Sequence, residues 1–533
     1  MEIRKLLVAN RGEIAARVFR TCRRLGIDTV AVAAPDDEGA YHAREADQVV
    51  PVAGYLEAEE HVRAAQETGA DGVHPGYGFL AENADFGEAV EAAGLTWVGP
   101  TSEALRASGD KLEAKRLARE AGVPVVPGGS PEEVGYPLIV KAAAGGGGRG
   151  MRVVHTAEDL EEALASARRE AKAGFGDERV FCERYVERPR HVEIQLLADA
   201  HGAVVHLGER ECSIQRRHQK VLEESPSPAL DPELREEMAA AAVAFTRAVG
   251  YRNAGTAEFM LAGGEFFFLE LNARLQVEHP VTELVTGLDL VEQQLRIAAG
   301  ERLGLESREP AGHAVEVRLY AEDPLTFLPQ AGRVERLELP HGVRVDAGVE
   351  AGDSVPVAYD PLIAKLIAAA DTRDEALALL SRALRETRVG GVTTNLGFLR
   401  WLVDHPEVRA GRTTTAFLAE HPPLSRTAEV PAPWRVDRDE PDRRPPPRVE
   451  DFAHGGEGGA GGKSALVAPM PGVVIRVLAG EGERVEPRQP LVVLEAMKME
   501  TPLVSPYKAV VSRVLVSEGD QVTGGAVLVE LEE

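Results

Sequence analysis

Apolar residues follow two alternating patterns over the first hundred residues of the chain. Short β-rich runs are separated by stretches in which apolar residues recur at helical spacing. The runs lie at 5–9, 29–33, 72–74 and 96–98, the helical stretches include 13–25 and 84–93, and a helical bridge is expected to follow over 105–121. This alternation predicts a doubly wound α/β domain with a parallel sheet. The three-glycine dinucleotide fingerprint is missing after the first run, so we expect this fold without an NAD site.

Two further α/β regions are expected before the pattern changes. A compact insert runs from about 130 to 203, and a larger unit with hairpins and helices such as 374–386 extends to about 420. From 422 to 462 Pro, Gly, Arg and acidic residues dominate, and little there can form a core. We interpret this segment as a flexible linker, whose roughly 40 residues of coil would have an r.m.s. span of about 35 Å.

The C-terminal segment contains an internal repeat. A shift of 37 positions brings Pro469 onto Pro506, 481–482 onto 518–519, and 491–492 onto 528–529. Two β-rich halves related in this way predict a small barrel or sandwich with a pseudo-twofold axis. Residues 496–501 lie unmatched between the halves and are expected to form an exposed hairpin tip that displays Lys498.

Composition and charge narrow the possible partners. The 533 residues are 44% hydrophobic and 27% charged, as in water-soluble globular proteins. A net charge of −26 argues against nucleic acid or an anionic membrane as the main partner, because both require excess Lys and Arg. No apolar run is long enough to span a bilayer, no signal peptide precedes the first strand, and the three cysteines lie far apart. We therefore expect a cytoplasmic protein.

A lysine ends an apolar strand beside a run of glycines. Lys141 follows the apolar residues 138–140, and 145–150 reads Gly-Gly-Gly-Gly-Arg-Gly. Consecutive glycines let backbone N–H groups converge on an anion, and the lysine can add a charge on phosphate. A flexible hairpin loop is the alternative, but it does not explain the position of the lysine. We interpret the segment as a lid that covers phosphate.

Two glutamates are expected to face each other across a hairpin. A two-residue turn at 263–264 would send the carboxylates of Glu258 and Glu270 to opposite faces, whereas a three-residue loop at 263–265 places them opposite each other with Asn272 on the same face. Facing carboxylates in a partly buried site repel unless a cation binds. Such oxygen ligands suit Mg²⁺ or Mn²⁺ bound with nucleotide phosphates. Exposed glutamates on a solvated hairpin are the alternative, which the apolar run 266–269 disfavours.

Polar residues continue downstream of this pair. Arg274 and Gln276 alternate with apolar residues, and Glu278 continues the same face if the segment is extended. A cation, an amide and a carboxylate in register could bind a small oxyanion and deprotonate it, and a solvated strand face is the alternative. Further polar clusters at 183–185, 191–193 and 215–220 interrupt apolar strand patterns, which is unusual outside a site.

Together these motifs resemble the biotin carboxylase component of biotin-dependent carboxylases, a member of the ATP-grasp superfamily. The matching segments are the glycine-rich lid and 7–15, 74–78, 109–111, 215–220 and 270–283. The sequence Ala-Met-Lys-Met at 496–499 resembles the biotin-accepting hairpin of biotin carboxyl carrier domains, whereas the related lipoyl domains place an acidic residue before their lysine. The whole chain therefore resembles the biotinylated α subunit of an acyl-CoA carboxylase.

The resemblance implies a domain order. An α/β part would comprise an N-terminal Rossmann-like domain at 1–113, an ATP-grasp domain at 114–329 with its lid at about 130–203, and an α+β biotin carboxylase C-terminal domain at 330–421. The linker at 422–462 would lead to a small all-β biotinyl domain, a flattened barrel, at 463–533.

It also implies the site residues. ATP would contact Lys111, Lys141, Gly146, Gly147, Gly148, Glu183, Arg184, Val186, His191, Gln215 and His218, with 183–186 as the adenine hinge. The metal ligands would be Glu258, Glu270 and Asn272, and bicarbonate would contact Arg274, Gln276, Val277 and its general base, Glu278. Lys220, Arg274 and Arg344 would complete the catalytic set, Tyr77 and Arg344 would contact biotin, and Lys498 would carry it.

The chemistry implied is ATP-dependent carboxylation of biotin. Bicarbonate would attack the γ-phosphate to give carboxyphosphate, and its breakdown would give CO₂ beside a phosphate that deprotonates the ureido nitrogen. Arg344 would stabilise the resulting enolate-like anion. Biotin, ATP and Mg²⁺ or Mn²⁺ are the implied cofactors. A carboxyltransferase β subunit, biotin protein ligase and a second copy of the carboxylase domain are the implied partners.

Two departures from the family pattern bear on these expectations. Ala144 stands where the family commonly extends its glycine run, and only the linker occupies the place of a β-rich docking domain found in many α subunits. Acetyl-CoA and propionyl-CoA are the default final substrates. A split pyruvate carboxylase is one alternative, and a biotin carrier with an inactive ATP-grasp part is another. The second is disfavoured because the motif positions hold chemically competent residues.

Overall fold

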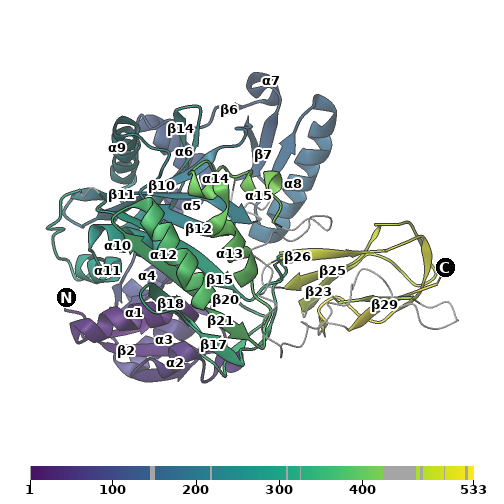
Figure 1. Cartoon of the computed structure of the whole chain (residues 1–533), viewed down its shortest axis with the longest axis horizontal. Helices are drawn as coiled ribbons and strands as arrows, with labels where there is room; N and C mark the ends of the chain where they lie inside the picture. Colours follow the sequence, from purple (N-terminus) through teal and green to yellow (C-terminus); the bar gives the residue numbers. More distant parts are fainter. Residues whose placement is uncertain are drawn as a thin grey trace, which may run out of the picture. The chain divides into compact units, whose positions relative to one another are not determined.

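The computed structural model describes residues 2–143, 151–216, 219–307, 310–324, 326–423, 464–468, 472–496, 499–522 and 526–532. The chain divides into two units. The first unit comprises Met1–Tyr320, Arg333–Ser354 and Leu362–His421, and the second comprises Ala321–Gly332, Val355–Pro361 and Pro422–Glu533. Figure 1 shows the elements of both. No helix among the described residues is long and apolar enough to cross a membrane.

A parallel sheet with the order β3-β2-β1-β4-β5 begins the first unit. Its strands are β1 (Lys5–Val8), β2 (Asp28–Ala33), β3 (Gln48–Pro51), β4 (Gly72–His74) and β5 (Thr96–Trp97). The accompanying helices are α1 (Gly12–Leu25), α2 (Tyr41–Arg44), α3 (Ala58–Thr68) and α4 (Ala84–Ala92). The predicted strands and the doubly wound fold are confirmed. The edge strand β3 was not predicted, because three of its four residues are exposed and its apolar pattern is weak.

The helix predicted over 105–121 is in fact two helices, α5 (Ser102–Gly109) and α6 (Lys111–Glu120). Between them Asp110 has the extended angles φ −92° and ψ 109°. Its carboxylate accepts hydrogen bonds from the backbone N–H groups of Leu112 and Glu113. A side chain that satisfies free N–H groups starts a new helix, so the single-helix prediction is wrong at this residue.

The insert contains an antiparallel sheet with the order β6-β9-β7-β8 and two helices. In chain order these elements are β6 (Gly128–Gly129), α7 (Pro131–Val134), β7 (Leu138–Ala142), β8 (Arg152–Val154), α8 (Leu160–Phe175) and β9 (Val180–Arg184). Leu138 and Val140 point into a small apolar cluster with Ala167 of α8, whereas Ile139 and Lys141 alternate with them and are half-buried. This alternation places Lys141 on the opposite face of the sheet from α8.

An eight-stranded sheet is the largest element of the first unit, with the order β14-β13-β10-β11-β12-β15-β20-β18. Its strands are β10 (Arg190–Ala198), β11 (Val204–Arg216), β12 (Gln219–Ser225), β13 (Asn253–Ala262), β14 (Glu265–Asn272), β15 (His313–Tyr320), β18 (Arg344–Ala347) and β20 (Leu362–Ala370). Helices α9 (Pro232–Ala248), α10 (His279–Thr286) and α12 (Arg373–Glu386) pack on it (Figure 1). Further elements of this unit are α11 (Leu290–Ala298), β17 (Arg336–Glu338), β21 (Arg388–Gly390), α13 (Leu396–Asp404), α14 (Pro406–Arg409) and α15 (Phe417–Glu420).

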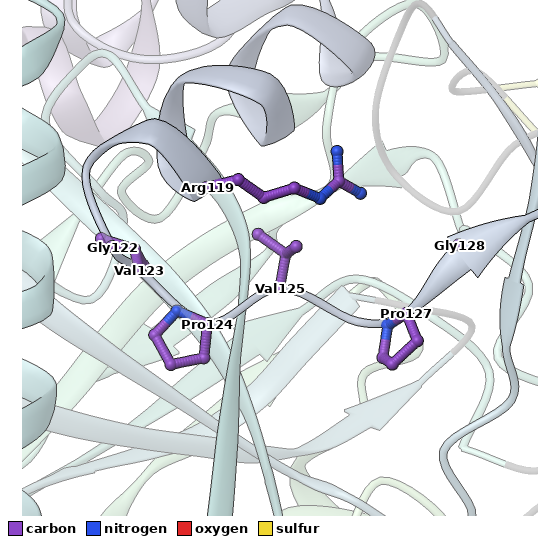
Figure 2. Close-up of a pocket in the computed structure, with 7 residues that line it drawn as sticks. All are labelled: Arg119, Gly122, Val123, Pro124, Val125, Pro127 and Gly128. Carbon is purple, nitrogen blue, oxygen red and sulfur yellow. The ribbon is translucent and has the colours of Figure 1, made fainter.

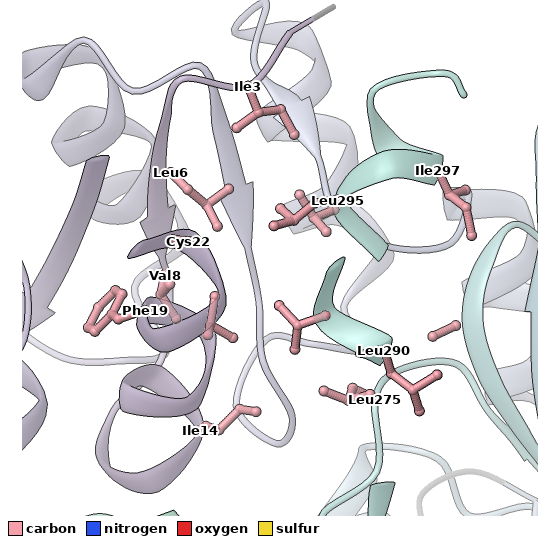
Figure 3. Packing of buried hydrophobic residues seen from close by; sticks show 14 of the residues in the cluster. Ile3, Leu6, Val8, Ile14, Phe19, Cys22, Leu275, Leu290, Leu295 and Ile297 are labelled. Carbon is pink, nitrogen blue, oxygen red and sulfur yellow. The ribbon is translucent and has the colours of Figure 1, made fainter. Parts of the chain in front are cut away.

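One apolar cluster joins the N-terminal sheet to the segment after β14 (Figure 3). Leu6 and Phe19, from β1 and α1, belong to the same cluster as Leu275, Leu290 and Leu295. Burying each side chain of this size contributes roughly 1.5–3 kcal/mol. The cluster therefore holds the loop from 273 to 278 against the N-terminal domain.

In the second unit, the described residues between 464 and 532 form two four-stranded antiparallel sheets that the 37-residue repeat relates to each other. One has the order β22-β29-β27-β24 and the other β26-β25-β23-β28. The strands are β22 (Ser464–Val467), β23 (Gly472–Val477), β24 (Arg484–Val485), β25 (Pro490–Ala496), β26 (Met499–Val504), β27 (Ala509–Val514), β28 (Gln521–Val522) and β29 (Val527–Glu532). The shift carries β23 onto β27 and β24 onto β28, and it carries the buried Leu491 onto the buried Leu528. The predicted all-β repeat is confirmed.

Candidate active site

Three glutamates stand in a row on neighbouring strands of the eight-stranded sheet. Glu193 of β10 lies directly opposite Glu258 of β13, and Glu258 lies directly opposite Glu270 of β14. Side chains of directly paired residues share one face of a sheet. Asn272, two residues beyond Glu270, lies on that face as well. The predicted juxtaposition of Glu258, Glu270 and Asn272 is therefore present, and Glu193 extends it.

The hairpin achieves this pairing differently from the prediction. Gly263 and Gly264 form a two-residue turn with φ values of 61° and 84°, and Ala262 pairs with Glu265. Glycine adopts such positive φ angles without steric cost, as this turn requires. The register then shifts between the Phe259–Phe268 pair and the Glu258–Glu270 pair, which leaves Leu269 as the extra residue of a β-bulge. The three-residue loop was wrong because the additional residue lies within the strand.

Lys220, on β12, connects the glutamate row to Glu278. Its Nζ atom lies 2.5 Å from Oε2 of Glu193, 2.8 Å from Oε1 of Glu258 and 2.6 Å from Oε1 of Glu278. Burial alone would lower the pKa of this ammonium group, but the three carboxylates raise the pKa well above its ordinary value. Lys220 therefore stays charged and draws the three carboxylates together.

Two buried arginines balance the remaining negative charge. Arg210 pairs with Glu193, and Arg318 donates to Oε2 of Glu278 at 3.0 Å and to Oε1 of Glu223 at 2.5 Å. Burial would raise the pKa of Glu278, but Lys220, Arg318 and Arg210 hold it well below its ordinary value. The Glu278 carboxylate is thus ionised at neutral pH, as a proton acceptor must be.

The loop from 273 to 278 is not the extended strand that the sequence suggested. Strand β14 ends at Asn272, and Glu278 has φ −82° and ψ 9° where α10 begins. Arg274 nevertheless donates to the side-chain oxygens of Asn272 at 2.9 Å and Gln276 at 3.2 Å, and Gln276 donates to Glu258 at 3.2 Å. The side chains converge because this polar network joins them, and not because they share a strand face.

Several features of the glutamate row fit a divalent cation with nucleotide phosphate. Burial and the neighbouring Glu258 raise the pKa of Glu270. Nδ2 of Asn272, a donor that suits a phosphate oxygen, is buried without a hydrogen-bond partner among the described residues, and Nε2 of His191 lies 3.2 Å from Oε2 of Glu258. Burial lowers the pKa of Lys111, and Glu270 partly offsets that effect. A cation beside Glu258 and Glu270 would relieve their repulsion, and phosphate would offset the charge of Lys111.

Three of the residues predicted to contact ATP, Lys141, Glu183 and Arg184, lie on the insert sheet, whereas Lys111 begins α6 and His191 lies on β10. Glu183, on β9, is almost completely buried, and its side chain pairs with Lys141 at 3.0 Å and with Lys115 of α6. The side chain of Glu183 thus holds two lysines, so a hinge contact would have to use the backbone. Arg184 donates its backbone N–H to the Pro127 carbonyl. Burial and Lys141 lower the pKa of Lys115 to about 8, against the raising effect of Glu183.

Arg344 and Tyr77 lie in a second polar cluster of the first unit. Arg344, on β18, pairs with Glu283 at 2.7 Å and with Asp346 at 2.8 Å. Tyr77 donates its hydroxyl hydrogen to Glu13, at the start of α1. The guanidinium of Arg344 is thereby fixed by two carboxylates, as expected of a group that must stay oriented.

Five predicted site residues lie outside the described residues, namely Gly146, Gly147, Gly148, His218 and Lys498. On either side of residues 497–498, Ala496 of β25 pairs with Met499 of β26. Gln215 lies on β11 and donates to the Cys212 carbonyl, and Val186 follows β9.

A surface pocket of about 530 Å³ lies elsewhere in the first unit (Figure 2). Its lining contains no predicted site residue and consists of Arg119, Gly122, Val123, Pro124, Val125, Pro127 and Gly128.

Comparison with protein families assigns each part of the chain. The model of the biotin carboxylase N-terminal domain matches 2–105, and that of the ATP binding domain of the carbamoyl-phosphate synthase L chain matches 110–306. The biotin carboxylase C-terminal domain matches 316–420, and the family described as biotin-requiring enzyme matches 464–531. The match to 110–306 includes Ala144, and the linker at 422–462 falls between two matched domains.

Individual relatives agree with this assignment. The chain is 46% identical to biotin carboxylase of Halalkalibacterium halodurans over 78% of its own length and 98% of that protein. It is 47% identical to the propionyl-CoA carboxylase alpha chain of Ruegeria pomeroyi, over 79% and 68%. It is also 46% identical to a pyruvate carboxylase subunit of Methanothermobacter thermautotrophicus, over 78% and 90%.

Solved structures show the same fold. The biotin carboxylase domain dimer of Hydrogenobacter thermophilus 2-oxoglutarate carboxylase, in complex with MgADP, ADP and bicarbonate, aligns with a TM-score of 0.77 and 42% identity. That alignment covers 79% of this chain and 98% of the other. Biotin carboxylase from Campylobacter jejuni aligns with a TM-score of 0.77 and 40% identity, over 79% and 99%.

Proposed function

This chain belongs to the biotin carboxylase family, and from that premise we propose that it is the biotin-carrying α subunit of an acyl-CoA carboxylase. It is an ATP-dependent biotin carboxylase with a domain of the biotin-requiring type on the same polypeptide. In the proposal, biotin is attached to Lys498 by a biotin protein ligase, and the carboxylated carrier serves a separate carboxyltransferase β subunit. The domain limits expected from the sequence and a homodimer of the carboxylase part belong to the same proposal.

One observation carries the proposal. Through its three ion pairs, Lys220 joins the base Glu278 to the carboxylate row that contains Glu258. The base acts on bicarbonate and the metal ligands act on ATP, and these two reactants must meet in one site. The buried ammonium group of Lys220 holds the base and the carboxylate row in one fixed geometry.

Proton transfer from bicarbonate is assigned to Glu278. Arg274, Gln276 and the backbone at Val277 would hold the anion, and Glu278 would accept its proton. Lys220 and Arg318 contact the two oxygens of Glu278 separately and keep it ionised. The deprotonated oxygen of bicarbonate then attacks the γ-phosphorus of ATP, and ADP leaves.

The nucleotide and metal ligands are assigned to the surrounding strands. Glu258, Glu270 and Asn272 would hold Mg²⁺ or Mn²⁺, which would offset the charge of the phosphate oxygens. Lys111, Lys141, His191 and Gln215 would contact ATP, and Glu183 would orient Lys141. The residues of the lid and His218 remain predictions from the sequence.

The acceptor side is assigned to Tyr77 and Arg344. Biotin supplies a ureido nitrogen that accepts the carboxyl group and transports it to a second site. Arg344, held by Glu283 and Asp346, would present a fixed cation to negative charge that develops there. Tyr77 would contact the bicyclic ring from the side of α1.

Acetyl-CoA and propionyl-CoA are our proposed final substrates, and a split pyruvate carboxylase is the second candidate. The similarity to the Methanothermobacter pyruvate carboxylase protein favours the second candidate, since the aligned part spans 90% of that relative. The carrier domain on this chain favours the first, because little of that relative remains unmatched for a domain of the kind found at 464–531. Purification of the native complex, followed by carboxylation assays with acetyl-CoA, propionyl-CoA and pyruvate, distinguishes the two.

The proposed half-reaction is tested with the biotinylated chain and ¹⁴C-bicarbonate. With MgATP, label should enter the protein, and omission of ATP or substitution Lys498→Ala should abolish this labelling. The Lys498→Ala chain should still carboxylate free biotin, which is the matched control for an intact carboxylase. A fully biotinylated wild-type chain that gains no label would contradict the proposal.

A further inference from the structure

Lys365, on β20, is a completely buried lysine whose ammonium group contacts distant parts of the first unit. Its Nζ atom lies 2.7 Å from Oε1 of Glu13 on α1, and it donates a hydrogen bond of 2.7 Å to the backbone carbonyl of Val277. Oδ2 of Asp346, directly opposite on β18, is 4.0 Å away. One cation thus connects the start of α1, the loop at Val277 and strand β18.

The contact with Val277 bears on the base. The carbonyl of Val277 belongs to the peptide group that leads into Glu278, so its orientation helps to set the direction in which the Glu278 side chain leaves the backbone. The loop from 273 to 278 lies outside the β ladder, and buried carbonyl groups in such segments need partners from elsewhere. Lys365 supplies that partner.

The contact with Glu13 bears on the acceptor side. Oε1 of Glu13 faces Lys365, whereas Oε2 accepts the hydroxyl hydrogen of Tyr77. The start of α1 also contacts the end of β18 closely, because a Cβ atom built at Gly348 would lie 2.6 Å from the backbone N of Glu13. Tyr77 therefore has a short polar connection to the loop that carries Glu278, through Glu13 and Lys365.

The third contact leads to Arg344. Asp346 lies two residues after Arg344 on β18 and receives hydrogen bonds from Arg344 and from Arg20 of α1. Asp346 is completely buried, and its Oδ2 atom lies 2.8 Å from the Arg344 guanidinium and 4.0 Å from the Lys365 ammonium group. Movement of the Lys365 ammonium group would change how strongly the Asp346 carboxylate attracts Arg344, because both cations face the same oxygen.

We propose that Lys365 is a positioning residue, which holds the base loop at Val277 in a fixed place relative to Tyr77 and Arg344. This inference rests on the proposed function, because it assigns Glu278 to bicarbonate and the other two residues to biotin. Carboxyl transfer needs the activated carbon and its acceptor in near-attack geometry, and a displacement of about 1 Å can slow such a reaction about a hundredfold. Lys365 acts on this alignment without touching either reactant.

The test replaces Lys365 by Met and measures how ATP hydrolysis is coupled to carboxylation. The proposed reaction consumes one ATP for each carboxyl group transferred. In Lys365→Met we expect the KM for bicarbonate to rise about tenfold, because the base loop is no longer held. We also expect at least about threefold more ATP hydrolysed per biotin carboxylated, while the KM for MgATP changes less than about threefold.

Two further variants separate alignment from folding. Lys365→Met leaves the buried Glu13 carboxylate without a cation, whereas Asp346 keeps Arg344 and Arg20, so Glu13→Gln with Lys365→Met removes the unpaired buried charge and should recover stability without recovering coupling. Lys365→Arg keeps the positive charge but places it on a planar guanidinium group, so it should restore coupling only in part. Lys5→Met is the matched control, since Lys5 also donates to a backbone carbonyl, that of Thr68, outside the site.

The outcomes are distinct. A folded Lys365→Met chain with unchanged bicarbonate KM and unchanged coupling overturns the positioning role, even if its kcat falls. A loss of coupling equal to that of Lys5→Met also overturns it. A wild-type chain without bicarbonate-dependent ATP hydrolysis overturns the proposed function, and the role of Lys365 with it.

Discussion

Glu223 and Glu316 show how residue-scale electrostatics operates behind the base. They lie directly opposite each other on β12 and β15, and both are completely buried. Arg318 contacts one oxygen of Glu223, whereas both oxygens of Glu316 lack hydrogen-bond partners among the described residues. Burial raises the pKa of Glu223 to about 7, with Glu278 adding to the effect, and burial raises the pKa of Glu316 well above its ordinary value, with Glu223 adding to the effect. Glu316 therefore retains its proton at neutral pH.

This pair predicts a pH-dependent effect of Glu316→Gln. A carboxyl group with a raised pKa binds its proton more tightly in the folded state, so folding stability falls as pH rises above the unfolded pKa. Glu316→Gln has no carboxyl group at this position, so its folding stability does not fall with pH for this reason. Its melting temperature should be close to that of the wild type at pH 5 and higher than the wild type at pH 8, by several degrees for a gain on the order of 1–2 kcal/mol.

Glu224→Gln is the matched control for that experiment. Burial would raise the pKa of Glu224, but His313 and Arg373 lower it below its ordinary value. Its contribution to stability is present above the unfolded pKa and is lost as pH falls. Glu224→Gln should therefore be most destabilised at neutral pH. A Glu316→Gln difference that is constant from pH 5 to pH 8 would contradict the raised pKa of Glu316.

Residues with a local motif could be predicted from the sequence, whereas their partners could not. Arg274, Gln276 and Glu278 follow one another in the chain, and Lys141 adjoins the glycine run. Lys115, Glu193, Arg318 and Lys365 act in the same networks, but each meets its partner through the tertiary fold. The polar cluster at 191–193 was the available signal for Glu193. A lone charge in the apolar run 362–370 was the corresponding signal for Lys365.

At the scale of elements, the errors came from single residues that change backbone geometry. Asp110 ends one helix and caps the next, because its carboxylate binds two free N–H groups. Leu269 forms a bulge that restores the register lost at the two-residue turn. Periodicity identifies a helix or a strand from many residues at once, so a one-residue interruption has little weight in it. The sheet and helix types were predictable, and these boundaries were not.

The close approach of β18 to α1 predicts that Gly348→Ala is disruptive. A Cβ atom there would lie 2.6 Å from the backbone N of Glu13, and backbone cannot move aside as a flexible side chain can. We expect a loss of about 1–3 kcal/mol in stability, as for other overpacked sites. Because the added methyl group displaces Glu13 from Lys365, the KM for bicarbonate should rise as well.

Gly304→Ala is the control for that substitution. No atom lies within 4 Å of a Cβ built at Gly304, and its φ is not positive. The variant should be neutral or more stable by up to about 1 kcal/mol, because alanine restricts the unfolded chain. Thermal unfolding and bicarbonate kinetics measure both variants. Equal behaviour of Gly348→Ala and Gly304→Ala would show that the contact between β18 and α1 is not tight.

For the whole molecule, the repeat was predictable because both of its halves are present in the sequence itself. The 37-residue shift maps strands, sheet order and core residues of one carrier half onto the other. The route by which the carrier reaches the carboxylase site was not predictable, since composition gives the reach of a linker but no direction.

Linker length should therefore limit the carboxylation of the chain's own carrier. Deletion of 427–456 leaves 11 of the 41 residues at 422–462, and the r.m.s. span of a coil falls from about 35 Å to about 18 Å. A tether shorter than the required distance gives almost no effective concentration, so ¹⁴C labelling of the carrier should slow at least about tenfold. Carboxylation of free biotin should not change, because the carboxylase residues are intact.

Replacement of 427–456 by Gly and Ser at equal length should keep labelling within about twofold, because reach is preserved. Labelling that survives the deletion at the wild-type rate and does not depend on protein concentration would show that reach is not limiting.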